Sequence, residues 1–144
     1  MKQNYDNHIR LYGPHHFIFL PLMSLLTLLG VYKAISSEDA ALVWSLFAVL
    51  CGCILYLAIM VRQHYALGNQ DRIVRLEFRL RYYELLGISA GGVENQLSFA
   101  QIAALRFASD PEFKALLARV LQEKLSGKDI KKLIKDWQPD YMRV

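Results

Sequence analysis

The run ALVWSLFAVLCGCILYLAIMV, from Ala41 to Val61, contains no charged residue over 21 positions. A helix needs about 20 consecutive apolar residues to cross the hydrocarbon core of a bilayer, and this run has that length. A core helix of a soluble protein is usually shorter and carries a polar stripe. We therefore expect residues 41–61 to span a membrane.

A second apolar segment, FIFLPLMSLLTLLGVYKAI, covers residues 17–35 and carries one charge, at Lys33. It is longer than the apolar region of about 7–15 residues in a signal peptide, and another apolar run follows it instead of a polar mature domain. We therefore expect it to be retained as a second span. The linker SSEDA, residues 36–40, is short enough to force an antiparallel hairpin over residues 17–61.

Basic residues gather outside the two predicted spans. Lys2 and Arg10 precede the first span, and five arginines follow the second: Arg62, Arg72, Arg75, Arg79 and Arg81. The turn between the spans carries Glu38 and Asp39. Since lysine and arginine are enriched in cytoplasmic flanks, both termini are expected to be cytoplasmic.

Small residues lie in register along both predicted spans. Helices pack closely in lipid where small residues let the backbones approach. We expect a packing face formed by Ser24, Thr27, Ala34, Ala41, Ser45, Ala48 and Gly52. The short turn favours packing between the two spans over dimerisation, because it keeps them at high effective concentration. Cys51 and Cys53 are interpreted as small apolar residues.

Histidines flank the predicted hairpin at one level: His15 and His16 before the first span and His64 after the second. Imidazoles brought together there offer ligands for a first-row metal. No HxxxH or HxxE pair lies on one helical face, and histidine also favours the headgroup region. The metal site is therefore the weakest of the alternatives, and no cofactor is expected.

Residues 62–86 predict an amphipathic helix, either continuous with the second span or bent near Gly68 and Asn69. Ile73, Leu76, Leu80 and Tyr83 follow the three-four-three spacing of a helix-pairing seam, which Val74, Phe78 and Leu85 widen. Helix-internal ion pairs are expected for Asp71 with Arg75, for Glu77 with Arg81, and for Arg81 with Glu84. Arg72 and Arg79 remain available for lipid phosphates or another chain.

Residues 87–144 predict a small module of short helices. GISAGG, residues 87–92, is interpreted as a flexible turn. Capping patterns begin at Ser98, Ser109 and Ser126. Pro111 supports the start of the second helix and Pro139 the end of the third. The second helix has the apolar face Phe113, Leu116, Leu117, Val120 and Leu121. In the third, Ile130, Leu133, Ile134 and Trp137 oppose Lys128, Lys131, Lys132 and Lys135.

Four phrases carry a resemblance that covers nearly the whole chain: QNYDNHIRLYGPHHF, QDRIVRLEFRLR, ALRFASDPEF and KDIKKLIKDWQPDYMRV. They resemble a family of small two-span bacterial membrane proteins, chiefly from Bacteroidota, whose function is not known. The resemblance implies a bacterial inner membrane and the two-span topology. It implies no activity and no catalytic residue.

Together these patterns predict an all-α membrane protein. It has an N-terminal flank (1–16), a transmembrane hairpin (17–61), a juxtamembrane helix (62–86) and a helical module (87–144). No catalytic motif occurs. We expect a non-enzymatic scaffold or accessory subunit that docks a protein partner, or itself, through the seam. The alternative is a membrane-tethered binder of nucleic acid or anionic ligands through Arg72, Arg79 and the lysine face, with nucleic acid the less favoured partner. No small-molecule substrate is expected.

Overall fold

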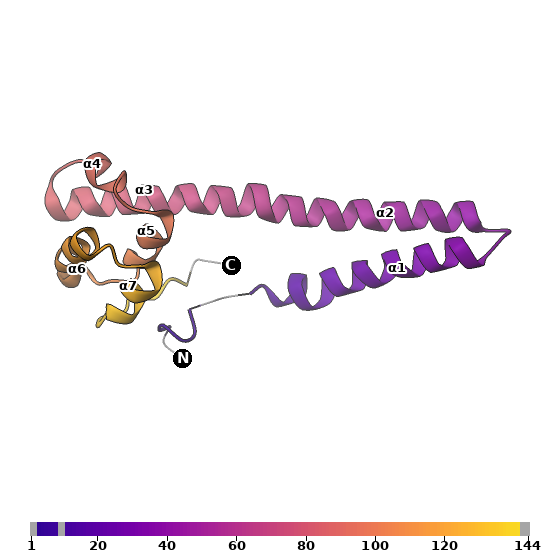
Figure 1. Cartoon of the computed structure of the whole chain (residues 1–144), viewed down its shortest axis with the longest axis horizontal. Coiled ribbons are helices and arrows are strands. Elements are labelled where there is room, and N and C mark those ends of the chain that lie inside the picture. The colour runs from indigo at the N-terminus through magenta and orange to yellow at the C-terminus, as the bar shows by residue number, and fades with distance from the viewer. Residues whose placement is uncertain (1–2, 9–10, 142–144) are drawn as a thin grey trace. The chain divides into compact units, whose positions relative to one another are not determined.

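The computed structural model describes residues 3–8 and 11–141, and all regular secondary structure in these ranges is helical. The elements, labelled in Figure 1 where there is room, are η1 (Pro14–Phe19), α1 (Leu20–Ser36), α2 (Ala41–Met60), η2 (Val61–Ala66), α3 (Leu67–Leu86), α4 (Gly91–Glu94), α5 (Phe99–Leu105), α6 (Asp110–Glu123) and α7 (Gly127–Leu133). The chain forms two compact units. We call residues 11–68 the apolar unit and residues 3–8 with 69–141 the module.

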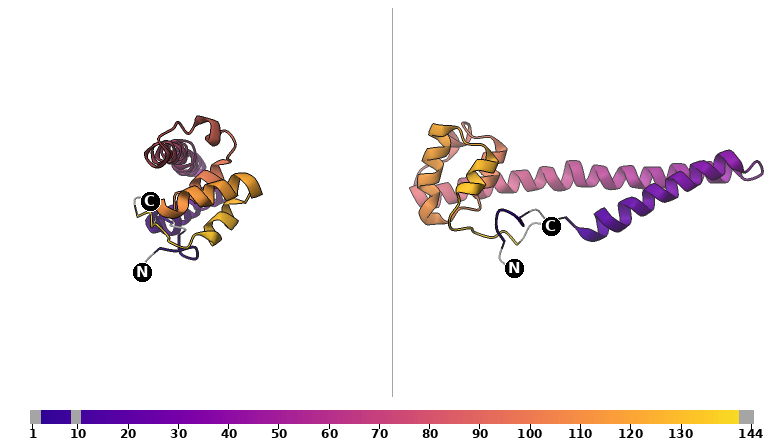
Figure 2. Two further views of the ribbon diagram at one scale, coloured as in Figure 1. Left: turned by 90° about the vertical axis from the view of Figure 1, so that its left-hand side faces the viewer. Right: turned by 60° about the horizontal axis from the view of Figure 1, so that its bottom comes forward.

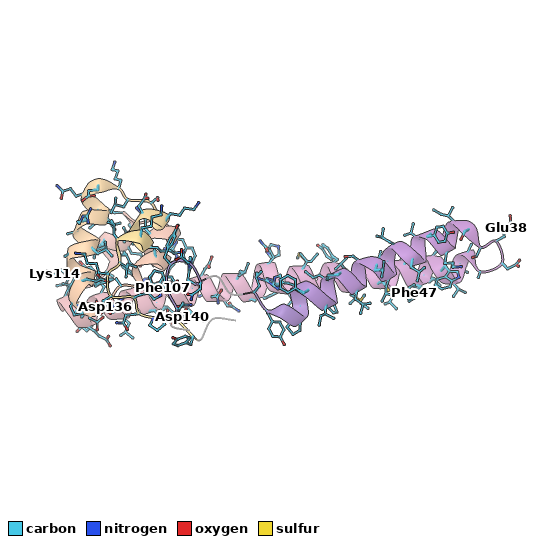
Figure 3. All side chains as sticks on the ribbon, turned by 90° about the horizontal axis from the view of Figure 1, so that it is seen from below. Glu38, Phe47, Phe107, Lys114, Asp136 and Asp140 are labelled. Atoms are coloured by element: carbon cyan, nitrogen blue, oxygen red, sulfur yellow. The ribbon has the colours of Figure 1, made fainter. Side chains whose placement is uncertain are left out.

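In the apolar unit, α1 and α2 run side by side in opposite directions, and Glu38 lies in the turn between them (Figures 1 and 3). The closest approach is at Gly30, where an added Cβ would lie 2.9 Å from Cβ of Ala48. One turn away, a Cβ on Gly52 would lie 3.9 Å from Cγ2 of Thr27. These contacts pair lower numbers on α1 with higher numbers on α2, as antiparallel packing requires.

The packing face of α2 differs from the predicted one at Ser45. Ala48 and Cys51 are buried, whereas Ser45 is exposed and donates its hydroxyl hydrogen to the carbonyl of Ala41 at 2.8 Å. The other predicted members are partly buried: Ser24, Thr27, Ala34, Ala41 and Gly52. Ala48 and Cys51 show which side of α2 faces α1. One turn earlier, that side includes Trp44, which is partly buried, and not Ser45.

Of the two alternatives after the second apolar run, a continuous helix and a bend near Gly68 and Asn69, the structure has the continuous helix. A single uninterrupted helix runs from Ala41 to Leu86, and Gly68 lies within it. Helical turns of π type occur at η1 and η2. At the end of η2, the amide of Leu67 donates to the carbonyl of Arg62. Helix α1 ends at Ser36, one residue after the end of the predicted first span, and α2 begins at Ala41, as predicted.

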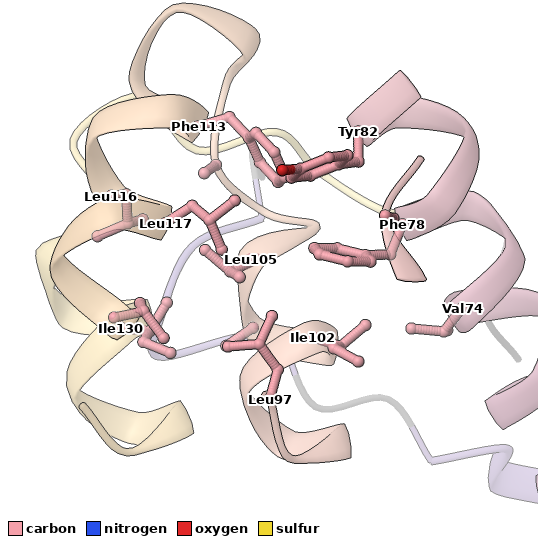
Figure 4. Packing of buried hydrophobic residues seen from close by; sticks show 14 residues of the cluster. Val74, Phe78, Tyr82, Leu97, Ile102, Leu105, Phe113, Leu116, Leu117 and Ile130 are labelled. Carbon is pink, nitrogen blue, oxygen red and sulfur yellow. The ribbon is translucent and has the colours of Figure 1, made fainter. Parts of the chain in front are cut away.

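The core of the module is formed by α3, α5, α6 and α7. Val74, Phe78 and Tyr82 of α3 point toward Ile102, Leu105 and Phe113, and Ile130 of α7 is fully buried (Figure 4). The predicted apolar face of α6 is confirmed. Phe113, Leu116, Leu117 and Val120 are buried, and Leu121 packs against the same cluster. Figure 2 shows α5, α6 and α7 grouped in this unit.

The predicted capping residues begin three helices. Ser98 donates its amide to Oε1 of Gln101 at 2.8 Å and accepts from the Gln101 amide at 3.3 Å. The amide of Ser109 donates to Oε1 of Glu112 at 3.3 Å, and that of Asp129 to Oγ of Ser126 at 3.3 Å. Each side chain satisfies an amide that the first helical turn leaves unpaired.

Two predictions in this region are wrong. Helix α7 ends at Leu133, so Ile134, Lys135 and Trp137 lie beyond it, and Pro139 does not terminate it. Instead, Trp137 forms an isolated bridge with Ala108, and the amide of Gln138 donates to the carbonyl of Phe107 at 2.8 Å. The segment 87–92 is not wholly a flexible turn either, because α4 begins at Gly91.

Residues 3–8 pack within the module, although the sequence-based division placed them in a separate flank. The amide of Asp140 donates to Oε1 of Gln3 at 2.7 Å, and Nε2 of Gln3 donates to the Asp140 carbonyl at 3.3 Å. His8 contacts the rings of Phe107 and Trp137, which themselves stack at 4.5 Å. The module is therefore built from both ends of the described chain.

Candidate functional site

Helix α3 presents two different apolar faces. Val74, Phe78 and Tyr82 are 4–6% exposed and pack into the module. The outer face, which we define as Ile73, Leu76, Leu80 and Tyr83, is 53–60% exposed. The predicted seam is thus present as a solvent-exposed stripe, while the residues predicted to widen it, Val74 and Phe78, turn inward.

Arg81 anchors α3 to the start of α6. Its Nη2 lies 2.7 Å from Oδ1 of Asp110 and donates to the carbonyl of Ala108 at 2.6 Å. The guanidinium lies over the Phe113 ring, 4.6 Å from its centre. A planar cation with several donors suits this combination of a carboxylate, carbonyls and an aromatic face.

Glu94 of α4 is a second anchor for α3, through Arg75 and Arg79. Its side chain is 6% exposed, and Arg79 and Arg75 both bind it, with Nη1 of Arg75 at 3.2 Å from Oε1. Hydrogen bonding from Arg79, and then from Arg75, holds the pKa of Glu94 below its usual value, although burial acts in the opposite direction. The same hydrogen bond raises the pKa of Arg79.

The predicted ion pairs within α3 are therefore wrong. Arg79 has no partner within α3, as predicted, but it is not left free for lipid or another chain, because Glu94 of α4 binds it. Arg75 and Arg79 bind Glu94, while Arg81 binds Asp110. Glu94 is buried, and leaving its carboxylate without a partner would be strongly destabilising, so the two arginines that can reach it pair with it. Within the described ranges, Arg72, Glu77 and Glu84 are left exposed beside the outer face with no ion pair.

The four lysines predicted to form one basic face are not equivalent. Nζ of Lys131 lies 2.9 Å from Nε2 of His8, and Nζ of Lys132 lies 5.9 Å from the centre of the Tyr5 ring. Lys135 lies beyond α7, where its amide donates to Oε2 of Glu112. Lys128 is exposed on α7. The N-terminal residues thus cover part of the predicted basic surface.

The histidines near the apolar helices are not assembled as a metal site. Nδ1 of His16 is 2.9 Å from the carbonyl of Tyr12, and Arg62 contacts the same ring. His15 stacks on Phe19. Across residues 3–8 and 11–141, no three histidine, cysteine, aspartate or glutamate side chains are grouped to hold a metal ion. His15, His16 and His64 are therefore not brought together with a further ligand.

Sequence patterns missed three features of this region. Glu94 and Asp110, which fix α3, follow segments whose sequence predicts a turn and a helix cap. Trp137 was assigned to a helix but stacks on Phe107, and its Nε1 is buried with no hydrogen-bond partner among the described residues. Each contact joins residues 15 or more positions apart, so no helical periodicity signals it.

The model of a family of unknown function (DUF6526) matches residues 1–144. No curated protein and no solved structure matches the chain.

Proposed function

The chain belongs to this family of unknown function (DUF6526), and we propose that it is a non-enzymatic integral membrane protein whose α3 helix docks a partner. In this proposal α1 and α2 cross a bacterial inner membrane as an antiparallel hairpin. Both termini and the module lie in the cytoplasm. The protein acts as a scaffold or accessory subunit.

The exposure of the apolar unit supports the membrane part of the proposal. Two helices, Pro14–Ser36 and Ala41–Leu86, are long and apolar enough to cross a membrane, and only 6% of each apolar window is buried. A core helix of a soluble protein with the same composition would be mostly buried. Exposed leucine, isoleucine and valine side chains at this density favour contact with lipid. The hydroxyls of Ser24 and Thr27 donate to carbonyls four residues earlier, which satisfies them without water.

The observation that carries the docking proposal is the exposure of the outer face. Ile73, Leu76, Leu80 and Tyr83 remain 53–60% exposed on a helix whose opposite side is fully packed. Aligned apolar residues on a helix that is already fixed in place are typical of a helix-docking surface. Because α3 is held by Arg81 and by the Glu94 pairs, docking requires little ordering of the helix itself.

The test is a comparison of two variants of the full chain in native membranes. Leu80→Glu places a charge on the outer face, whereas Ile88→Glu places one at a residue of similar exposure, 58%, outside that face. We expect chemical crosslinking to capture a complex for the original chain and for Ile88→Glu, and to lose it for Leu80→Glu. A complex that persists in both variants would contradict docking through this face.

The alternative, binding of nucleic acid or anionic ligands, receives less support. Arg79 is engaged with Glu94, and Lys131 and Lys132 contact residues 3–8. Of the predicted set, this leaves Arg72, Lys128 and Lys135 as exposed residues whose side chains are not engaged in this way. Binding driven by phosphate contacts weakens strongly with salt. Salt-dependent binding of RNA or DNA by the detergent-solubilised chain would favour this alternative.

A further inference from the structure

The charges that border the outer face are arranged by sign. Taking Ile73 and Leu80 as positions a, and Leu76 and Tyr83 as positions d of a heptad, both g positions are arginine: Arg72 and Arg79. Both e positions are glutamate: Glu77 and Glu84. The outer face therefore has one basic edge and one acidic edge over two heptads.

This arrangement distinguishes between the two ways of pairing identical helices. In a parallel, in-register pair, a g residue faces the e residue five positions later on the other helix. Arg72 then faces the partner's Glu77, and Arg79 faces the partner's Glu84. In an antiparallel pair, g faces g and e faces e, which places arginine against arginine and glutamate against glutamate. Only the parallel arrangement is electrostatically complementary.

We infer that the outer face is the interface of a parallel homodimer, in which α3 of one copy pairs in register with α3 of a second copy. This inference rests on the proposed docking function and specifies its occupant. Arg79 is 55% exposed while it binds Glu94, so its guanidinium also has room for a second carboxylate. Glu77, Glu84 and Arg72 have no competing ion pair within the described part of the chain.

The fold agrees with this occupant in a second respect. The residues of α3 that the module buries, Val74, Phe78 and Tyr82, are at positions b, f and c. The residues at the a, d, e and g positions of the two heptads are exposed. Two heptads are too short for a stable coiled coil in free solution. Two copies held in the same membrane are at raised effective concentration, which compensates for the short seam.

Two single-cysteine variants of the full chain, reconstituted in lipid vesicles, test whether α3 pairs in parallel and in register. Cys51→Ala and Cys53→Ala first remove the two native thiols. Leu76→Cys then places a thiol at position d, where the two copies of a parallel in-register pair meet within disulfide distance. Asp71→Cys, exposed at position f of the same helix, is the matched control. Under mild oxidation we expect disulfide dimers at position 76, and several-fold fewer at position 71.

A charge exchange tests the partner and its register. Arg72→Glu and Glu77→Arg, each introduced into the Leu76→Cys chain, produce like-charge contacts in their own homodimers. When the two variants are mixed, both 72–77 contacts regain opposite charges. We expect several-fold less disulfide dimer from each variant alone and recovery as a mixed dimer when the two carry different tags. A folding defect would not be reversed by mixing.

The outcomes separate this inference from the proposed function. Equal crosslinking at positions 71 and 76, or no recovery on mixing, would overturn the parallel homodimer. If the homodimer is overturned but Leu80→Glu loses a complex with a different protein, the docking function is retained and its partner is that protein. If Leu80→Glu changes no complex of either kind, both are overturned.

Discussion

Arg79 binds the buried carboxylate of Glu94 through two nitrogens, Nε to Oε2 and Nη2 to Oε1, the latter at 3.1 Å. The two residues are 15 positions apart and belong to different helices, α3 and α4. Arg75 completes the contact from one turn earlier. This contact ties the segment after Gly87 back onto α3 and fixes which side of α3 faces outward.

Glu94→Gln should destabilise the module by about 1–2 kcal/mol, because a neutral amide forms weaker hydrogen bonds to two cations. The pKa of Glu94 is lowered in the folded chain, so the unfolded chain binds a proton more readily. The stabilisation is therefore present above the ordinary pKa of glutamate and is lost as the pH falls from there through the lower pKa of the folded chain. Thermal unfolding of the full chain in detergent should show a smaller acid-induced loss of stability for Glu94→Gln than for the original chain.

Phe78→Ala should destabilise the module by about 3–5 kcal/mol, since it empties a packed position beside Phe113. Leu80→Ala, two residues away on the exposed outer face, should change stability by no more than about 0.5 kcal/mol. Hydrogen exchange of the α6 amides in the full chain measures both effects. Similar exchange in the two variants would contradict the assignment of inner and outer faces.

Arg81→Lys should cost about 1–2 kcal/mol, because a lysine cannot reach Asp110 and two carbonyls while stacking on Phe113. Arg72→Lys is the control, since Arg72 is exposed and the substitution preserves its charge. We expect a lower unfolding temperature for the first variant only. Equal temperatures would show that Arg81 is not an anchor.

Gly30→Ala should weaken packing between α1 and α2 by about 1–3 kcal/mol, because its Cβ would meet Cβ and Cα of Ala48 at 2.9 and 3.0 Å. Gly52→Ala places a methyl group 3.9 Å from Thr27, an ordinary contact, and should be tolerated. The temperature at which each variant aggregates in mild detergent compares the two. If both behave alike, the close approach at Gly30 does not determine the packing.

Local patterns in the sequence predicted what depends on local physics. The length of the apolar runs located α1 and α2. A serine with glutamine, glutamate or aspartate three positions later located the starts of α5, α6 and α7. The three-four spacing at Ile73, Leu76 and Leu80 identified the outer face of α3. These signals are readable because each arises within one or two helical turns.

Contacts between distant segments were not predictable in the same way. Spacing alone favoured Glu77 as the partner of Arg81, but the fold brings Asp110 close enough to replace it. Helical periodicity continued through Trp137, but its ring stacks on Phe107, which ends α7 early. Small-residue spacing included Ser45 and missed Gly30, because only the partner helix determines which small residue is at the point of closest approach.

The reciprocal hydrogen bonds between Gln3 and Asp140 have a consequence for biosynthesis. Residues 3–8 leave the ribosome before the residues they pack against, from Phe107 to Asp140, are translated. Both apolar helices are synthesised in the interval. The contacts of residues 3–8 can therefore form only after Asp140 has been translated, so the module closes later than both apolar helices are made.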